Sequence, residues 1–264
     1  MKIVAPMRMT ELQDFTGRTA LVTGAASGIG AACARALASA GAAKLILVDV
    51  DQSGLAALDL PCDVERVTGS VADEALWDRI APHLRGLDYG VVNAGVGGFG
   101  TIDELDFAEW RRVMAINLDG AFLTLRAALR AIKTSAHEHG GSIVITGSST
   151  GVKPVPGIGP YGPAKAAVAH MARIAAMENA SANIRVNAIA PGGVDTAIWE
   201  TGADFKRSVE TLGREATIAR MAKTTPLGRF ATSEEIAASI LFLLSDAASN
   251  ITGEVLVSDG GFTL

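Results

Sequence analysis

Short runs of apolar residues alternate along this chain with longer stretches in which apolar positions recur every three or four residues. The short runs are typical of buried strands, and the longer stretches are typical of helices that cover a sheet. Strands are expected at 18–23, 44–49, 65–71, 141–146, 184–190 and 254–257, and another starts at Tyr89 and runs into a loop of small residues. This alternation predicts an α/β fold: a doubly wound, seven-stranded parallel sheet with helices on both faces.

The pattern also indicates domain organisation. No linker and no internal repeat interrupts it, which favours one domain over two small ones. We expect a flexible leader over residues 1–15 and a single domain over 16–264. The polar stretch at about 197–225 separates the sixth strand from the next helix, and it is a candidate lid over a substrate.

Composition and charge exclude several classes of function. Lys and Arg number 23 and Asp and Glu number 28, so the net charge is −5 and we expect no nucleic-acid partner and no membrane association. Two cysteines, Cys33 and Cys62, make no disulfide framework, which favours a cytoplasmic location. His137 and His139 lie two residues apart in a polar segment. Two histidines in such a segment are more often solvated than metal-bound, so we expect no metal site.

The first expected strand ends at Thr23 and runs directly into a glycine-rich turn, followed by an alanine-rich helix. Glycine lets the backbone turn sharply and approach a pyrophosphate, whose charge meets the free N–H groups of the helix. A plain strand–helix turn has similar letters, but strand, turn and helix together predict a Rossmann-type dinucleotide site. The residues expected to contact the cofactor in this turn are Gly24, Ser27, Gly28, Ile29 and Gly30.

Asp49 ends the second expected strand, nineteen residues after Gly30. A carboxylate at this place accepts hydrogen bonds from both hydroxyls of an adenosine ribose and repels a 2′-phosphate. No Lys or Arg in the glycine turn or directly after Asp49 is available to neutralise such a phosphate. We therefore expect NAD rather than NADP as the cofactor, with Val50 next to Asp49 in the same site.

Tyr161 and Lys165 stand four residues apart in an expected helix whose first turn contains Pro163. One helical turn places the two side chains on the same face. A neighbouring ammonium favours the phenolate, and a pKa lowered by two to three units corresponds to about 3–4 kcal/mol. By itself, such a pair is common on the surface of helices. Because the same sequence also contains the glycine turn and Asp49, Tyr161 becomes a candidate acid/base.

The motifs Gly24-x3-Gly28-x-Gly30, Asn93-Ala94-Gly95, Ser148, Tyr161-x3-Lys165 and Pro191-Gly192 follow one another in this order. In this combination the chain resembles the short-chain dehydrogenase/reductase family, over nearly everything from Phe15 to Leu264. The resemblance implies a small-molecule alcohol or ketone as substrate and a homo-oligomer, either tetramer or dimer.

The resemblance also implies roles for individual residues. Tyr161 is the expected acid/base, Lys165 lowers its pKa and holds the nicotinamide ribose, and Ser148 hydrogen-bonds the substrate oxygen. Asn117 supports a water relay behind the lysine. Further cofactor contacts are implied for Asn93, Ala94, Gly95, Pro191, Gly192, Val194 and Thr196.

One departure from the family pattern concerns the adenine. The family usually has Asp-Val after the third strand, whereas the spacing here places Ser70-Val71 there. Asp63-Val64 has the usual letters but stands upstream. We favour Ser70 with Val71, and Asp63 stays open as the alternative.

The expected function is an oxidoreductase that transfers a hydride between NAD(H) and a secondary alcohol or ketone. Two alternatives stay open. An NADPH-linked 3-ketoacyl-type reductase is disfavoured by Asp49, and a non-catalytic NAD-binding regulatory protein of the same fold has no need of the four candidate catalytic residues. Residues expected to form the substrate wall are Gly97, Gly98, Ser148, Ser149, Pro156, Gly193 and Trp199.

Overall fold

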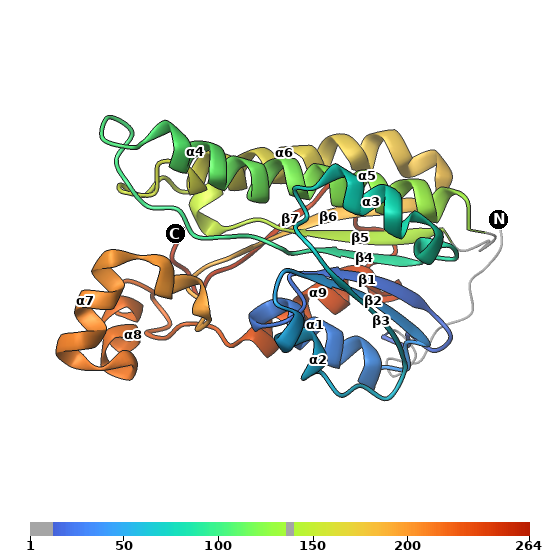
Figure 1. Cartoon of the computed structure of the whole chain (residues 1–264), viewed down its shortest axis with the longest axis horizontal. Coiled ribbons are helices and arrows are strands. Elements are labelled where there is room, and N and C mark those ends of the chain that lie inside the picture. The colour runs from blue at the N-terminus through green and yellow to red at the C-terminus, as the bar shows by residue number, and fades with distance from the viewer. Residues whose placement is uncertain (1–12, 136–139) are drawn as a thin grey trace.

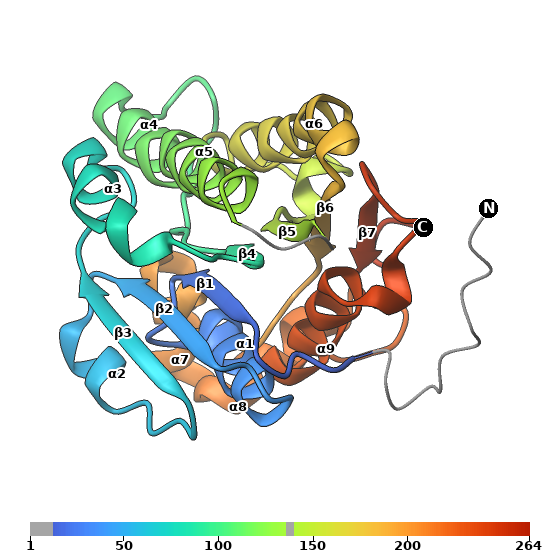
Figure 2. The same ribbon diagram turned by 90° about the vertical axis from the view of Figure 1, so that its right-hand side faces the viewer.

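A seven-stranded sheet forms the centre of the protein in a computed structural model, which describes residues 13–135 and 140–264 (Figures 1 and 2). The strands are β1 (Thr19–Thr23), β2 (Lys44–Asp49), β3 (Asp63–Thr68), β4 (Tyr89–Val92), β5 (Gly141–Thr146), β6 (Ile184–Pro191) and β7 (Val255–Ser258). Their order is β3-β2-β1-β4-β5-β6-β7, and every neighbouring pair is parallel. The predicted doubly wound fold of the Rossmann type is confirmed.

Helices cover both faces of this sheet (Figure 2). The helices are α1 (Gly28–Ser39), α2 (Gln52–Ala56), α3 (Glu74–Ile80), α4 (Phe107–Met114), α5 (Gly120–Lys133), α6 (Tyr161–Asn179), α7 (Ala203–Leu212), α8 (Arg214–Ala222) and α9 (Ser233–Leu244). Helices α3 to α6 lie on one face, and α1, α2 and α9 lie on the other. Helices α7 and α8 extend away from the sheet, within the stretch expected to form the lid (Figure 1).

The strand sequences explain why both faces are covered. Leu45 and Leu47 of β2 pack into the core formed with α1 and α9. Ile46 and Val48, which alternate with them, pack into the second core beneath α3, α5 and α6. Because successive side chains of a strand point to opposite faces, a continuous apolar run requires a helix layer on each side.

Three boundaries differ from the sequence prediction. The expected leader ends earlier, because Phe15 is wholly buried and packs edge-on against Tyr89 with ring centres 5.1 Å apart; residues 1–12 lie outside the described residues. Strand β3 begins and ends earlier than expected, so Ser70 and Val71 follow it. The third difference is a π-helical turn over Ala115–Asp119, between α4 and α5, which the spacing of apolar residues did not predict.

None of the helices within the described ranges is both long enough and apolar enough to cross a membrane. Within the same ranges no group of three His, Cys, Asp or Glu side chains could hold a metal ion. His137 and His139 fall outside the described residues. Cys33 lies in the core beside α9, and burial raises the pKa of its thiol to about 12, as suits a packing residue.

Candidate active site

The glycine turn has the tight geometry that its sequence predicts. The backbone φ is +65° at Gly24 and +52° at Gly28, a region that disfavours side chains. A Cβ at Gly30 would lie 2.0 Å from the Gly24 carbonyl oxygen, and one at Gly28 would lie 3.2 Å from the Thr196 methyl carbon. The turn is therefore closed on the inside by its own backbone, and it faces the segment that follows β6.

Asp49 holds this turn in place. One of its carboxylate oxygens accepts a hydrogen bond from the Ala26 N–H at 2.9 Å, and the other accepts one from the Asp51 N–H at 3.0 Å. The carboxylate is thus fixed at the end of β2, directly beside the start of α1. Each oxygen retains acceptor capacity for a ligand hydroxyl.

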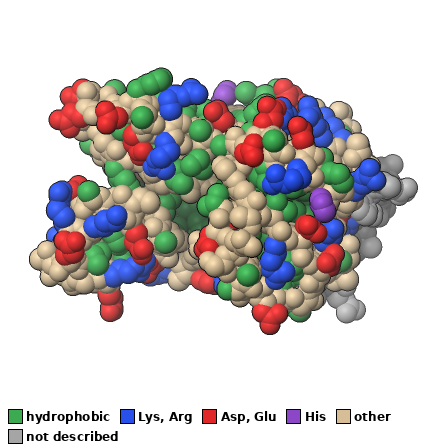
Figure 3. Space-filling model, viewed as in Figure 1, with side chains coloured by type: hydrophobic (Ala, Val, Ile, Leu, Met, Phe, Trp, Pro, Cys, Tyr) green, Lys and Arg blue, Asp and Glu red, His purple; other side chains and the backbone are tan. Residues whose placement is uncertain are grey.

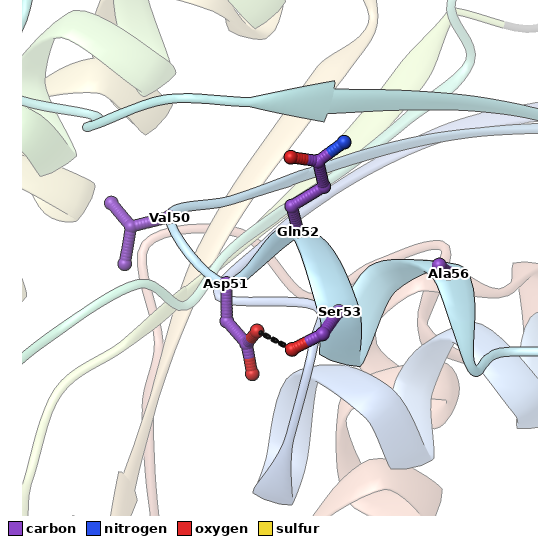
Figure 4. A pocket seen from close by; sticks show the side chains of 5 residues that line it. All are labelled: Val50, Asp51, Gln52, Ser53 and Ala56. Atoms are coloured by element: carbon purple, nitrogen blue, oxygen red, sulfur yellow. Dashed lines mark hydrogen bonds between the residues drawn. The ribbon is translucent and has the colours of Figure 1, made fainter.

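A surface hollow of about 480 Å³ adjoins Asp49 and is lined by the segment from Val50 to Ala56 (Figure 4). Val50 is 69% exposed although it is apolar, and its side chain points away from α2. Asp51 accepts hydrogen bonds from the Ser53 hydroxyl at 2.6 Å and from the Gly54 N–H at 3.0 Å. Asp51, which the sequence reasoning did not single out, lines this hollow and uses its carboxylate to cap α2.

The structure separates the two candidates for the adenine contact. Asp63 pairs with Lys44 at the start of β2, whereas Thr68 pairs with Asp49 at its end. Asp63 therefore lies at the opposite end of the sheet from the glycine turn, and Ser70 lies on the near side. The Val71 side chain is buried and its carbonyl accepts a hydrogen bond from the Trp77 indole at 2.9 Å, so a cofactor contact there would use its N–H.

A buried polar network joins the ends of β1, β4 and β5. The Thr23 hydroxyl accepts hydrogen bonds from the N–H groups of Asn93 and Ala94, at 3.0 and 3.2 Å. The Asn93 amide donates to the Thr23 carbonyl at 3.1 Å and accepts from the Thr146 hydroxyl at 3.2 Å. Asn93 thus links the ends of β1, β4 and β5 by hydrogen bonds, a structural role that the motif alone did not reveal.

Asn117 performs a similar task from the π-helical turn. Its side chain accepts a hydrogen bond from the Val96 N–H at 2.9 Å and donates to the Val96 carbonyl at 2.8 Å. A Cβ at Gly95 would lie 2.6 Å from the Asn117 side-chain oxygen and 3.4 Å from Lys165 Nζ. The side chains of Asn117 and Lys165 therefore both lie next to Gly95. The π-helical turn that carries Asn117 is of a kind that is frequent at functional sites.

The candidate catalytic side chains converge as the sequence predicts. Ser148 caps a short turn after β5, and its hydroxyl is 2.9 Å from that of Thr150 and hydrogen-bonds the Tyr161 phenol. Tyr161 opens α6 and is partly exposed. Lys165 is buried one turn later, with its ammonium 5.6 Å from the centre of the tyrosine ring.

The electrostatics of this group differ from the expectation. Burial raises the pKa of Tyr161 to about 12, partly offset by the hydrogen bond with Ser148. Burial also lowers the pKa of Lys165 to about 8, and its ammonium donates to the Thr146 carbonyl at 2.8 Å. The expectation that Lys165 by itself lowers the phenol's pKa is wrong: in the protein alone, Tyr161 stays protonated at neutral pH.

The segment after β6 is held from behind by Phe230. A Cβ at Gly193 would lie 2.2 Å from the Phe230 ring, and the Ala231 N–H donates to the Gly193 carbonyl at 2.9 Å. Trp199 stacks on Phe230 and donates its indole N–H to the Val194 carbonyl at 2.8 Å. Gly193 and Trp199, both expected at the substrate wall, therefore have a structural role in shaping the Val194 backbone.

Three further glycines allow neighbouring segments of the chain to pack closely against one another. A Cβ at Gly192 would lie 2.7 Å from the Asp259 Cα, and its N–H donates to the Ser258 carbonyl, so Pro191 and Gly192 are fixed against β7. A Cβ at Gly97 would lie 2.6 Å from the Thr201 hydroxyl oxygen, and one at Gly98 would lie 2.6 Å from Val113. Gly97 thus lies against the start of the candidate lid.

The candidate lid contacts this edge of the sheet at its base. Gly202 packs on the ring of Phe99, with 3.2 Å from an added Cβ to that ring. Arg214 at the start of α8 pairs with Asp195 at 2.6 Å and with Glu200 at 3.5 Å. Figure 3 shows the surface hollow that separates α7 and α8 from the α4 side, with hydrophobic side chains on its floor.

A second cavity, of about 520 Å³, lies between the loop after β5 and the loop before α4. Pro156 lines it, as do Thr150, Val155 and Ile158, and apolar side chains dominate the wall. Ser149, another residue expected to contact substrate, is 3% exposed and lies inside the turn after Ser148.

Comparison with known proteins extends this picture. A family model described as enoyl-(acyl carrier protein) reductase matches residues 24–263. The chain is 41% identical to cis-4-hydroxycyclohexanecarboxylate dehydrogenase of Sinomonas cyclohexanicum, over 95% of this chain and 98% of that protein. It is 36% identical to a protein named inactive 2-(S)-hydroxypropyl-CoM dehydrogenase 2 of Xanthobacter autotrophicus, over 87% and 99%.

A crystal structure of levodione reductase superposes with a TM-score of 0.84 at 33% identity, covering 94% of this chain and 98% of that one. This chain belongs to the short-chain dehydrogenase/reductase family. It is accordingly an oxidoreductase of the dehydrogenase/reductase type, in a family that uses nicotinamide cofactors.

Proposed function

We propose that the protein transfers a hydride between NAD(H) and a secondary alcohol or ketone, with Tyr161 as the acid/base. The observation that carries this proposal is the convergence of Ser148, Tyr161 and Lys165 on one wall, opposite the glycine turn that Asp49 closes. A non-catalytic protein that only binds the cofactor would need the glycine turn and Asp49 but not the three side chains. The protein named inactive among the relatives makes this distinction worth testing.

The residues present fit a dinucleotide. Added Cβ atoms at Gly28 and Gly30 would meet protein atoms at 3.2 and 2.0 Å, so both glycines are needed to keep the turn close to the start of α1. The carboxylate of Asp49, held at the end of β2 by the N–H groups of Ala26 and Asp51, disfavours a 2′-phosphate, which supports NAD over NADP. Thr196, Val194 and Lys165 would hold the nicotinamide half, and Ser70 the adenine.

The bound nicotinamide supplies the centre that gives or receives the hydride. The protein's contribution is positioning and proton transfer. Ser148 donates a hydrogen bond to the substrate oxygen, and Tyr161 gives that oxygen a proton or takes one from it. Lys165, held by the Thr146 carbonyl, keeps a positive charge next to the tyrosine ring.

The raised pKa of Tyr161 favours one direction at neutral pH. With a pKa of about 12 in the protein alone, the phenol carries the proton that a ketone oxygen must receive. Alcohol oxidation requires the phenolate and therefore needs the added positive charge of an oxidised cofactor beside the phenol. We infer that, near pH 7, ketone reduction starts from the protonation state that Tyr161 already has, whereas alcohol oxidation depends on the cofactor to lower its pKa.

We propose a substrate with a compact, largely apolar body. The floor of the hollow between α4 and the helices α7 and α8 is hydrophobic, and the Phe99 ring lies against Gly202 of the candidate lid. Relatives named for hydroxycyclohexanecarboxylate and levodione support a ring alcohol or ring ketone as the first class to test. A homo-oligomer and a cytoplasmic location stay predictions.

The test combines substrate turnover with a pair of tyrosine variants. Purified protein is incubated with NAD+ or NADP+ and a panel of secondary alcohols, or with the reduced cofactors and ring ketones, while cofactor absorbance is followed. We expect turnover with the NAD pair, and a loss of about 10²–10⁴-fold in Tyr161→Phe. Tyr89→Phe, which alters the only other tyrosine in the sequence, serves as the matched control.

NADH binding, followed by fluorescence, should survive in Tyr161→Phe. Turnover in that variant at close to the wild-type rate would exclude the acid/base role. NADH binding without turnover on any alcohol or ketone of the panel would favour the non-catalytic alternative.

A further inference from the structure

Thr150 is the neighbour of Ser148 that the family motif does not name. Its hydroxyl oxygen lies 2.9 Å from Ser148 Oγ, and its N–H donates to the same oxygen at 3.2 Å. Both contacts come from the short turn Ser149–Gly151, which Ser148 caps. Thr150 therefore approaches the candidate catalytic serine with two polar groups at once.

The turn is fixed in place, so these contacts are not those of a loose loop. A Cβ at Gly151 would lie 2.8 Å from the backbone of Lys165 and Ala166, which means that the turn rests directly on α6. The N–H groups of Val152 and Lys153 donate to the Ser149 carbonyl at 3.0 and 2.8 Å. The distance between the two hydroxyls is therefore set by the backbone.

The two contacts limit where the proton of Ser148 can point. A serine hydroxyl has one proton and two lone pairs. The Thr150 N–H occupies one lone pair. The Thr150 hydroxyl, at 2.9 Å, meets either the second lone pair or the proton. If the Thr150 hydroxyl is the donor, both lone pairs are occupied and the proton of Ser148 is left for a third partner.

We propose that Thr150 is a positioning residue that fills both acceptor sites of Ser148 and so makes this serine a donor only. The inference rests on the proposed function, in which Ser148 contacts the substrate oxygen. The proposal therefore fixes the route of the proton. An alcohol cannot give its proton to Ser148 and must give it to Tyr161. A ketone oxygen accepts hydrogen bonds from both Ser148 and Tyr161.

The N–H of residue 150 is present whatever the side chain, so the test concerns the hydroxyl. Thr150→Val removes it at nearly constant shape, and Thr150→Ser restores it. Thr101→Val is the matched control, because Thr101 lines the same cavity as Thr150 but its hydroxyl bonds Glu104 at 3.2 Å. Thermal unfolding checks each variant, and Thr150→Ala replaces Thr150→Val if the latter does not fold.

We expect Thr150→Val to lower kcat about three- to tenfold, the net value of one hydrogen bond, with the KM for cofactor unchanged. Thr150→Ser and Thr101→Val should stay within about twofold of wild type. The pH at which kcat/KM for alcohol oxidation reaches its plateau should rise in Thr150→Val, because before substrate binds a misdirected Ser148 no longer donates its proton to the phenolate. A packing role alone would not move that pH.

A second readout needs neither cofactor nor substrate. In a Tyr89→Phe background, the phenol absorbance after a rapid jump to alkaline pH reports Tyr161 alone, since the sequence contains two tyrosines. Thr150→Val should leave more Tyr161 protonated at a given alkaline pH than Thr150→Ser does. The inference would be overturned if Tyr161 titrated at the same pH in both variants, or if both variants lost the same share of kcat.

The two levels of proposal fail differently. If wild type turns over its substrate and Thr150→Val matches it in kcat and pH profile, the positioning role is wrong and the proposed function stands. If no substrate is turned over but the titrations of the two variants differ, the positioning role stands and the proposed function is wrong.

Discussion

The two walls of the candidate site are built from different material. The nucleotide wall, at the ends of β1 and β2, consists of backbone: a glycine turn whose N–H at Ala26 is held by Asp49. The chemical wall, at the ends of β5 and β6 and the start of α6, consists of buried and partly buried side chains held by neighbouring side chains and by the Thr146 carbonyl. Ser148, Tyr161, Lys165 and Thr146 make up this second wall.

The difference explains how each wall tolerates change. A backbone wall accepts few side chains, because any added atom meets protein at once, but its chemistry is simple. A side-chain wall can be re-tuned by single substitutions, because each pKa and each hydrogen bond depends on its neighbours. Three predictions separate the two walls, and a fourth concerns the lid.

The largest expected effect is a pH dependence at the chemical wall. Below its pKa the phenol of Tyr161 is protonated, so alcohol oxidation should rise about tenfold per pH unit until the pKa in the cofactor complex is reached. Ketone reduction should stay flat near neutral pH. Because a positive cofactor ring lowers this pKa, the plateau of oxidation should begin below the value of about 12 that applies to the protein alone. Initial rates over a pH series measure it, and oxidation that does not change with pH would contradict the acid/base role.

Gly30→Ala tests the nucleotide wall. Its Cβ would lie 2.0 Å from the Gly24 carbonyl oxygen, so the turn must open, at a cost of about 1–3 kcal/mol in the free energy of unfolding. NADH affinity should fall with it. Gly90→Ala, whose Cβ would approach nothing closer than 3.4 Å, is the control. Equal unfolding temperatures for the two variants would show that the turn is not rigid.

Asp49→Ala should narrow the preference for NAD over NADP about tenfold, or about 1.4 kcal/mol, because the carboxylate no longer repels a 2′-phosphate. The ratio of kcat/KM for the two cofactors measures this. Asp59→Ala removes an exposed carboxylate of the same charge and should leave the ratio as it is. An unchanged ratio in Asp49→Ala would exclude the ribose role.

The smallest effect is expected at the lid. Arg214→Gln breaks the pairs with Asp195 and Glu200, which are exposed and so contribute about 0.2–1 kcal/mol each. We expect KM for the substrate to rise no more than about threefold. Arg207→Gln is matched to it, because Arg207 pairs with Asp204 inside α7 and does not reach the segment after β6. If both variants behave alike, the lid is not held by Arg214.

Local sequence patterns were enough for the sheet and for much of the nucleotide wall. Apolar runs set the strands, glycine spacing set the turn, and one helical turn brought Lys165 below Tyr161. What local patterns could not supply were contacts between distant residues, such as Thr146 with Asn93 and Phe230 with Gly193. The Gly193 example is instructive, because a glycine expected to leave room for substrate leaves room for an aromatic ring.

The pKa of Tyr161 was missed for a related reason. The sequence identifies the cation one turn away, but it does not say how much water the fold removes from both groups. Burial is the largest cause of the pKa shift in both groups: it raises the pKa of the phenol and lowers the pKa of the ammonium. A motif therefore predicts which groups meet, and the three-dimensional structure decides their protonation.

The π-helical turn over Ala115–Asp119 has a consequence for engineering. It fits one extra residue into a helix whose two halves otherwise follow the ordinary spiral, and it aims Asn117 at Val96. Shortening that turn by a single position would rotate α4 against α5 by about 100° while leaving the apolar sequence of both halves unchanged. Because both helices carry wholly or nearly buried side chains, Val113 in α4 and Leu125 in α5, such a deletion would disturb the packing of a helix as well as the position of Asn117.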